Sequence, residues 1–166
     1  MFGAYEWAVL AGLVIVLLFG FVVIVGPPYV PTLRKQTEAA LDLLNLQPGQ
    51  TLLELGSGDG RVMLLAARRG WRVIGIELNP ALVLVSRLVT WRYRSQVRII
   101  WGSYWGKPWP PANAIFTFML PRYMSTLDTR IEQWHHGPLH VASFGFVIPG
   151  KTPVKQHEGV FLYEYK

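Results

Sequence analysis

The sequence predicts an α/β fold with a mostly parallel sheet, preceded by one N-terminal transmembrane helix. Short apolar runs of strand length alternate with helical segments after residue 50, a pattern typical of parallel strands joined by helices. Ahead of them, Trp7 to Gly26 carries no charge over roughly 20 positions, about the length that crosses the hydrocarbon core of a bilayer. The chain of 166 residues has room for one domain and this attachment.

The flanks of the predicted span give it an orientation. Arg34 and Lys35 follow the span, whereas no Lys or Arg precedes it. Because positively charged flanks stay inside, we expect a single-pass membrane protein whose C-terminal domain lies in the cytoplasm, or on the matrix side in a mitochondrion. A cleaved signal peptide and a buried core helix are the alternatives, but a signal peptide requires a basic start and a shorter apolar core.

Three segments are predicted along the chain: a transmembrane anchor over 1–26, a proline-rich connector with one helix over 27–49, and the α/β domain over 50–166. Thr32 is the expected N-cap of the connector helix. Periodicity and turn residues predict helices over 32–44 (or to 46), 61–69, 81–93 and 125–134, and strands over 51–55, 72–76, 97–101, 114–120, 140–146 and 160–165, the last antiparallel.

A glycine-rich loop follows the first predicted strand, with the sequence Glu54-Leu-Gly-Ser-Gly-Asp-Gly60. Glycines suit a backbone that turns tightly and comes close to a bulky ligand. The dinucleotide-binding pattern G-x-G-x-x-G would require a small residue at position 61, where the chain has Arg61. The loop therefore favours S-adenosylmethionine over a dinucleotide or a ligand-free turn, with Glu54, Gly56, Ser57, Gly58, Asp59 and Gly60 as the expected contacts.

A second acidic residue stands at the end of the next strand. Glu77 lies 21 positions after Gly56, at the carboxyl end of a neighbouring strand, where a carboxylate can accept the ribose hydroxyls of a nucleoside. A surface or capping role is the alternative. Leu78 and Asn79 complete this predicted cofactor segment. Glu54 is expected to orient the cationic methionine end of the cofactor, unless it pairs with a nearby arginine.

The charge, cysteine and histidine content limits the classes of partner and metal site that we expect. The net charge is +6, with few acidic residues answering the arginines at 61, 68, 69, 72, 87, 92, 94 and 98. We expect this basic face to meet anionic headgroups; a solvated arginine face and nucleic acid are the alternatives, and no nucleic-acid module is visible. The absence of cysteine excludes disulfides and thiolate metal sites. Apart from Glu132, no carboxylate stands at ligand spacing from the histidines at 135, 136 and 140, so no metal is expected.

Several motifs together resemble a known family, the membrane-anchored class I (seven-strand) protein lysine methyltransferases related to the mitochondrial enzymes that modify the ATP synthase c-subunit and the adenine nucleotide translocase. The resemblance rests on Pro28-Tyr-Val-Pro-Thr32, Arg34-Lys-Gln36, Gly56 to Arg61, Gly75-Ile-Glu-Leu-Asn-Pro80, Ser86-Arg87, Trp91-Arg92, Phe118 to Pro121, Met124 and Thr152-Pro153. It implies a compact Rossmann-like methyltransferase fold, S-adenosylmethionine as cofactor, and lysine N-methylation near the bilayer of a small membrane protein similar to the ATP synthase c-subunit.

The chain departs from the family at two places that bear on the site. Ser103 stands where the family has an acidic residue near the adenine, so Ser103 and Tyr104 are the expected adenine contacts. Met119-Leu120-Pro121 replaces Gly-Val-Pro and narrows the expected acceptor entry. Methyl transfer depends on positioning and desolvation. The expected acceptor channel comprises Tyr29, Thr32, Pro121 and Tyr123. A lipid or hydrophobic small-molecule methyltransferase and a non-catalytic assembly factor are the functional alternatives.

Overall fold

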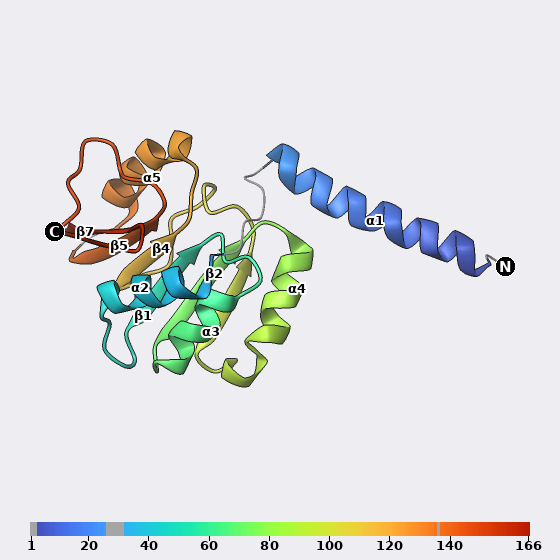
Figure 1. Cartoon of the computed structure of the whole chain (residues 1–166), viewed down its shortest axis with the longest axis horizontal. Coiled ribbons are helices and arrows are strands. Elements are labelled where there is room, and N and C mark those ends of the chain that lie inside the picture. Colours follow the sequence, from blue (N-terminus) through green and yellow to red (C-terminus); the bar gives the residue numbers. More distant parts are fainter. Residues whose placement is uncertain (1–2, 26–31, 136) are drawn as a thin grey trace.

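The computed structural model describes residues 3–25, 32–135 and 137–166. Helix α1 (Ala4–Val25) comes first and is drawn apart from the α/β domain that contains the remaining elements (Figure 1). The side chains of Tyr5, Trp7 and Leu10 on this helix are exposed. The predicted boundaries at residues 26 and 49 remain predictions, because part of the connector lies outside the described residues.

The predicted transmembrane anchor is wrong. Within the described parts of the chain, no helix combines the length and the apolar character that crossing a bilayer requires. The prediction rested on the length of an uncharged run and on the rise per residue of a helix, and these two criteria do not by themselves make a span. The expected single-pass membrane localisation, with its cytoplasmic or matrix-side domain, is corrected with it.

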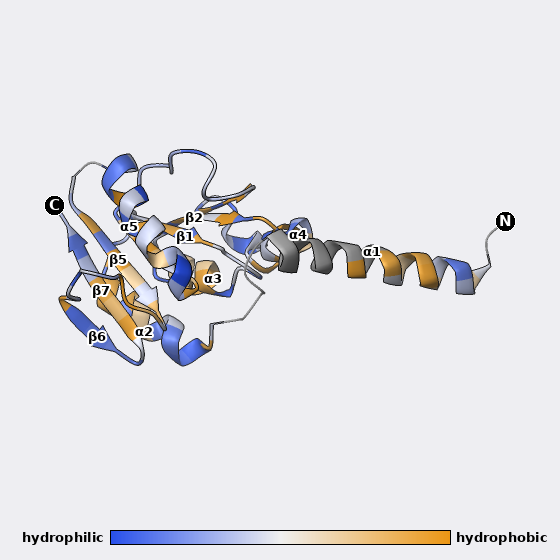
Figure 2. Cartoon of the chain, turned by 90° about the horizontal axis from the view of Figure 1, so that it is seen from above, coloured by the Kyte–Doolittle hydropathy of each residue, from blue (hydrophilic) through white to orange (hydrophobic). Residues whose placement is uncertain are grey.

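The domain contains the mostly parallel sheet that the sequence predicts. Its strands are β1 (Thr51–Leu55), β2 (Arg72–Glu77), β3 (Val97–Trp101), β4 (Ala114–Thr117), β5 (Leu139–Phe144), β6 (Lys155–His157) and β7 (Val160–Tyr165). Their spatial order is β3-β2-β1-β4-β5-β7-β6. The pairs from β3 to β5 are parallel, whereas β7 is antiparallel to both β5 and β6. The sequence did not reveal β6, which is fully exposed and hydrophilic (Figure 2).

Two hydrophobic layers hold the helices against the sheet. Helices α2 (Arg34–Leu44) and α3 (Arg61–Arg68) share one core cluster with side chains such as Leu52 and Phe116. Helix α5 (Pro121–Trp134) contributes to the other cluster, which contains Leu53 and Ile115. Successive strand residues face opposite sides, so these clusters cover the two faces of the sheet. Helix α4 (Pro80–Val89) packs on β2 and β3 and is followed by a short 3₁₀ turn, Trp91–Tyr93.

Some helix and strand boundaries differ from the prediction. Leu33, rather than Thr32, occupies the N-cap position of α2, and no side chain caps that end. Strand β4 ends at Thr117, three residues earlier than expected, and α5 begins at Pro121, four residues earlier than expected. Proline fits the first helical turn, because its missing N–H would have no helical partner there. Pro121 thus starts a helix as well as following a strand.

The topology marks one edge of the sheet for a ligand. Strand β1 lies between β2, the next strand along the chain, and β4, which follows β3 in sequence. The chain therefore turns to opposite sides of β1, and such a switch point opens a crevice at the carboxyl ends of the strands. The glycine loop begins at the end of β1, so the fold places it in that crevice.

Candidate cofactor site

The glycine loop needs glycine at all three predicted positions. Gly56, Gly58 and Gly60 have φ values of 82°, 53° and 83°, which are left-handed conformations that side chains disfavour. The backbone N–H groups of Gly56 and Ser57 both donate to the Ile76 carbonyl, at 2.9 and 3.1 Å. The end of β2 therefore holds the start of the loop, and Gly60 then forms the N-cap of α3.

Glu77 links the loop to the end of β2. One carboxylate oxygen accepts the Gly58 N–H at 2.8 Å, and the other accepts the Asn79 N–H at 2.7 Å. Glu77 is buried, and both of its carboxylate oxygens accept a backbone hydrogen bond. Each oxygen retains acceptor capacity, since a carboxylate has about four lone-pair sites. The predicted ribose role remains a prediction, and the structure adds a second role, which is to hold the loop.

Asn79 and Leu78 position the start of α4. The Asn79 side-chain oxygen accepts the Ala81 N–H at 2.9 Å, so Asn79 is the N-cap, and Pro80 follows in the first turn. Asn79 is 1% exposed, and its side-chain nitrogen has no hydrogen-bond partner within the described residues. The Leu78 carbonyl accepts the indole N–H of Trp101 at 3.1 Å. These two residues border the crevice beside Glu77.

Glu54 contrasts with Glu77 because it lies next to the same loop without comparable partners. Its side chain is 4% exposed, and its Oε2 atom accepts no hydrogen bond from any described residue. Burial, followed by the nearby charges of Glu77 and Asp59, raises the pKa of Glu54 well above its ordinary value. The alternative that Glu54 pairs with an arginine is not what the structure shows, since none of the ion pairs among the described residues includes it.

Ser57 and Gly75 fit tightly together beneath the loop. A Cβ added to Gly75 would collide with the Met63 sulfur and would lie 2.7 Å from the Ser57 Cβ. The Ser57 hydroxyl is buried without a hydrogen-bond partner within the described residues. A glycine in the middle of strand β2 is the sequence signal for this close approach, and it was not used in predicting the site.

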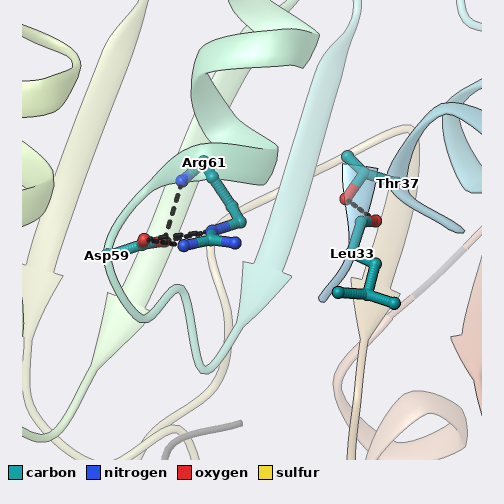
Figure 3. A network of polar contacts seen from close by, with 4 residues as sticks. All are labelled: Leu33, Thr37, Asp59 and Arg61. Carbon is teal, nitrogen blue, oxygen red and sulfur yellow. Dashed lines mark hydrogen bonds and ion pairs between the residues drawn. The ribbon is translucent and has the colours of Figure 1, made fainter. Parts of the chain in front are cut away.

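Asp59 is already engaged by its neighbour Arg61. Its carboxylate accepts the Arg61 backbone N–H at 3.2 Å and pairs with the guanidinium at 2.7 Å (Figure 3). The nearby bond from the Thr37 hydroxyl to the Leu33 carbonyl belongs to α2 (Figure 3). The predicted cofactor contact of Asp59 remains a prediction.

The segment after β3 reaches back to the glycine loop. Tyr104 approaches Gly56, since a Cβ added there would lie 3.9 Å from the Tyr104 ring. Burial, with Tyr123 and Glu77 nearby, raises the pKa of Tyr104 to about 12, so its phenol is neutral at physiological pH. The Ser103 hydroxyl instead accepts the Trp105 N–H at 3.1 Å and stands at an exposed turn. The adenine contacts expected of these two residues remain predictions.

The predicted acceptor residues are only partly brought together. Tyr123 lies 6.0 Å from Trp105, ring centre to ring centre, and Trp105 meets Tyr104 edge-on at 4.9 Å. An aromatic row (Tyr104, Trp105 and Tyr123) thus connects the start of α5 with the glycine loop. Pro121 is exposed two residues before Tyr123. This connection was not predicted from the sequence, because Trp105 and Tyr123 stand on separate segments.

Of the remaining predicted acceptor features, the structure describes Thr32 and Met119. Thr32 is buried two residues before α2 begins, and no described contact joins it to the aromatic row. Tyr29 lies outside the described residues. Met119, expected to narrow the acceptor entry, is 1% exposed and packs in the core with Met124 and Leu127.

The basic face predicted from the sequence is exposed on α4 and the strand after it. Arg87, Arg92, Arg94 and Arg98 are all exposed. The Arg94 guanidinium stacks 5.0 Å from the Trp91 ring centre. The expected attraction of this face to anionic headgroups remains a prediction.

The buried polar groups of the crevice fit a nucleoside cofactor with a cationic end. Glu54 Oε2, Ser57 Oγ and Asn79 Nδ2 are buried without partners among the described residues, although buried polar atoms are normally hydrogen-bonded. Glu54 stands at the end of β1, Ser57 lies in the loop itself, and Asn79 directly precedes α4. The carboxylates can accept hydrogen bonds from ribose hydroxyls and can pair with an ammonium group. The hydroxyl and the amide nitrogen can donate further hydrogen bonds to a ligand.

Comparison with known proteins decides the family. The protein-family model for the ANTKMT methyltransferase domain matches residues 54–155 of the sequence. These residues include the glycine loop, Glu77 and the aromatic row. The chain belongs to this family. The family resemblance predicted from the sequence is therefore confirmed, and so is the class I methyltransferase fold without its predicted transmembrane helix.

Two curated relatives and one solved structure illustrate the similarity of this ANTKMT-family chain. It is 31% identical over 128 residues to the human ATP synthase C-subunit lysine N-methyltransferase, covering 76% of this chain and 54% of that protein. It is 32% identical over 130 residues to the mouse adenine nucleotide translocase lysine N-methyltransferase, covering 76% and 56%. The chain spans about half the length of the curated relatives it matches.

The similar solved structure is an RNA methyltransferase from Salinibacter ruber in complex with S-adenosyl-L-homocysteine. The TM-score is 0.75 at 27% identity, and the alignment covers 82% of this chain and 92% of that one. Unlike the curated relatives, this protein is matched over nearly its whole length. The ANTKMT-family domain therefore has the class I methyltransferase fold.

Proposed function

We propose that the chain is an S-adenosylmethionine-dependent protein-lysine N-methyltransferase. The observation that carries the proposal is the crevice at the end of β1, where three positive-φ glycines adjoin the buried and unpartnered carboxyl oxygen of Glu54. Membership of the ANTKMT family supports methyl transfer as the reaction. The names of the matched relatives support a lysine of a protein as the acceptor.

Different residues of the crevice would bind different parts of the cofactor. Glu77 retains free acceptor sites for the ribose hydroxyls while it holds the loop through Gly58. Glu54, at the end of β1 where the loop begins, would receive the ammonium of the methionine end. Tyr104, beside Gly56, would line the floor below the adenine or the methionine portion. Ser103 would contribute less than a carboxylate does, because a neutral hydroxyl accepts more weakly.

Methyl transfer requires a neutral amine in line with the donor. S-adenosylmethionine supplies the electrophilic methyl group on a sulfonium. The protein's part is to orient the lysine and to remove water around its amine, which lowers the pKa of the amine and favours the neutral nucleophile. Trp105, Tyr123 and Pro121 would form an apolar wall for this purpose, since the aromatic row connects them to the loop. Thr32 and Tyr29 remain proposed acceptor residues without a described contact to that wall.

The acceptor protein is a further part of the proposal. The relatives are named for the ATP synthase C-subunit and the adenine nucleotide translocase. A lysine of a protein of this kind is the substrate we propose for this chain. Action close to a bilayer was expected from the anchor, and without that anchor it remains a prediction of the sequence resemblance alone.

Labelled methyl donor tests the proposal directly. The purified chain is incubated with radiolabelled S-adenosylmethionine and a host-cell extract, and the extract is then separated into protein, lipid and RNA. We expect label in protein, released as methylated lysine after acid hydrolysis. Label in lipid would favour the hydrophobic small-molecule alternative, and label in RNA would favour the activity named for the Salinibacter ruber protein.

A loop variant supplies the matched control. Gly58→Arg places a long side chain in the glycine loop, at a position with φ of 53°, and should abolish methyl transfer. Thermal unfolding of the variant checks that the domain still folds. A chain that binds no S-adenosylmethionine in a calorimeter and labels nothing would instead support the non-catalytic assembly factor.

A further inference from the structure

We propose that Glu54 carries a proton in the free protein and releases it when the cationic methionine end of the cofactor enters, so that cofactor binding is coupled to proton release. The inference rests on the proposed function, because it needs a cofactor with an ammonium group. It goes beyond the proposed function by assigning a protonation state and a pH dependence to one side chain. Three observations on Glu54 lead to it.

The first observation is burial without a donor. Glu54 is 4% exposed, and its Oε2 atom accepts no hydrogen bond within the described part of the chain. A charged oxygen in such a position loses its hydration, and no hydrogen bond replaces it. The neutral acid avoids this cost, because a protonated carboxyl does not require a counter-charge. Glu77 shows the opposite case, since two backbone N–H groups stabilise its charge.

The second observation concerns the groups that face Glu54. Glu77 approaches from β2 and Asp59 from the loop, and both raise the pKa of Glu54 after the larger effect of burial. Arg61 at the start of α3 pairs with Asp59 rather than with Glu54. The neighbours of Glu54 in the sheet are Gly75 on β2 and Phe116 on β4, and neither titrates. Among the described residues, no ion pair therefore supplies Glu54 with a counter-charge before the cofactor arrives.

The third observation is the position of Glu54 relative to the loop. Glu54 precedes Gly56 by two residues, and its neighbours across the strand pairs place it under the loop that bends back over β2. A cationic group entering the crevice becomes the counter-charge that the carboxyl lacks. The exchange balances: the carboxyl O–H bond breaks, the proton leaves to solvent, and the carboxylate pairs with the incoming ammonium.

Calorimetry measures the released proton. S-adenosylhomocysteine is the probe, because it carries the same ammonium end without a transferable methyl group. It is titrated into the wild-type chain at about pH 6.5, where an α-amino group with a pKa of about 8 is protonated. The titration is repeated in buffers that differ in ionisation enthalpy. We expect the observed enthalpy to vary with buffer as it would for proton release, with the released amount approaching one proton as the pH of the titration is lowered.

The pH profile gives a second readout. Below the pKa of Glu54 in the free protein, each unit of rising pH should tighten binding by up to about tenfold, and above that pKa the affinity should level off. Glu54→Gln keeps the shape of the side chain and removes the titration. The variant should bind with no proton release and with an affinity that does not vary with pH in this range.

The outcomes separate this inference from the proposed function. Tight binding by wild type without proton release would overturn the inference and leave the proposed function standing. No binding at any pH would overturn both. Infrared difference spectra of wild type test the same inference without the variant, so they remain informative if Glu54→Gln does not fold. The C=O stretch of the protonated carboxyl should disappear when the probe binds. A carboxyl band that is absent before binding would contradict the inference regardless of the variant.

Discussion

The ends of β1 and β2 carry the same residue type at similar burial but in opposite electrostatic situations. Glu54 on β1 is 4% exposed and Glu77 on β2 is 7% exposed. Two backbone N–H groups bind the Glu77 carboxylate, whereas Glu54 Oε2 has no described donor. Burial thus does not determine the role of an acidic residue, because the donors around it decide whether its charge is stabilised. Glu77 binds the backbone of the loop, whereas Glu54 Oε2 receives no hydrogen bond from the described residues.

Glu77→Ala should produce the largest effect. The substitution removes two charge-assisted hydrogen bonds, each worth about 1.5–3 kcal/mol, and leaves the Gly58 and Asn79 N–H groups unpaired. We expect a loss of about 3 kcal/mol in the free energy of unfolding, which lowers Tm by about 6–12 °C for a chain of this size. Binding of S-adenosylhomocysteine should weaken at least ~100-fold. Denaturant unfolding measures the loss of stability, and calorimetry measures the loss of affinity. A variant as stable as wild type would contradict the role of Glu77 in stabilising the loop.

Gly75→Ala tests the packing at the β2 residue that pairs with Glu54. The added Cβ would collide with the Met63 sulfur and would lie 2.8 Å from the Ser57 hydroxyl. Overpacking of this kind costs about 1–3 kcal/mol, and chemical denaturation measures it. Gly106→Ala is the matched control, because its nearest contact is the Ser103 carbonyl oxygen at 3.8 Å. If both variants lost the same stability, tight packing around Ser57 would not be the cause.

The two strand ends also differ in how far the sequence could predict them. The glycine spacing, Glu77 and the alternation of strands and helices predicted the fold class and the cofactor, because turn residues and periodicity are local features of the sequence. The family was predicted from the additional motifs that resemble it. The absence of a donor for Glu54 could not be predicted, since it depends on which backbone groups from β2 and α4 come within reach. The aromatic row was missed for the same reason: Tyr104 and Tyr123 stand on separate segments.

The N-terminal segment shows the limit of a length criterion. The uncharged run predicted both a helix and a span, and helix α1 is present from Ala4 to Val25. Within the described residues, however, no helix meets the requirements for crossing a bilayer. Charge-free length identifies a helix more reliably than it identifies the surroundings of that helix.

Glu54→Gln should reveal the difference between the two acids in the absence of cofactor. A carboxyl whose pKa is raised by folding binds more protons in the folded state, from its ordinary value of about 4.5 up to the raised value. The stability of wild type therefore falls as pH rises through this window and is constant above it. The variant lacks this loss, so its advantage over wild type should grow with pH by up to about 1.4 kcal/mol per unit. Denaturant unfolding at several pH values checks the trend, and a constant difference would mean that Glu54 is ionised in both states.

Asp59→Asn should have the smallest effect and sharpens the electrostatic side of the comparison. Asp59 is the weaker of the two acidic neighbours that raise the pKa of Glu54, and its charge is partly offset by Arg61 at 2.7 Å. Its removal lowers the pKa of Glu54, so the pH profile for S-adenosylhomocysteine binding should shift toward lower pH. At a fixed acidic pH the affinity should rise by no more than about fivefold, equivalent to ~1 kcal/mol for a partly exposed charge. If Asp59 itself contacts the cofactor, the affinity falls equally at every pH, while the midpoint of the profile still shifts downward. A midpoint that does not move, or that moves toward higher pH, would contradict the effect of the Asp59 charge on the pKa of Glu54.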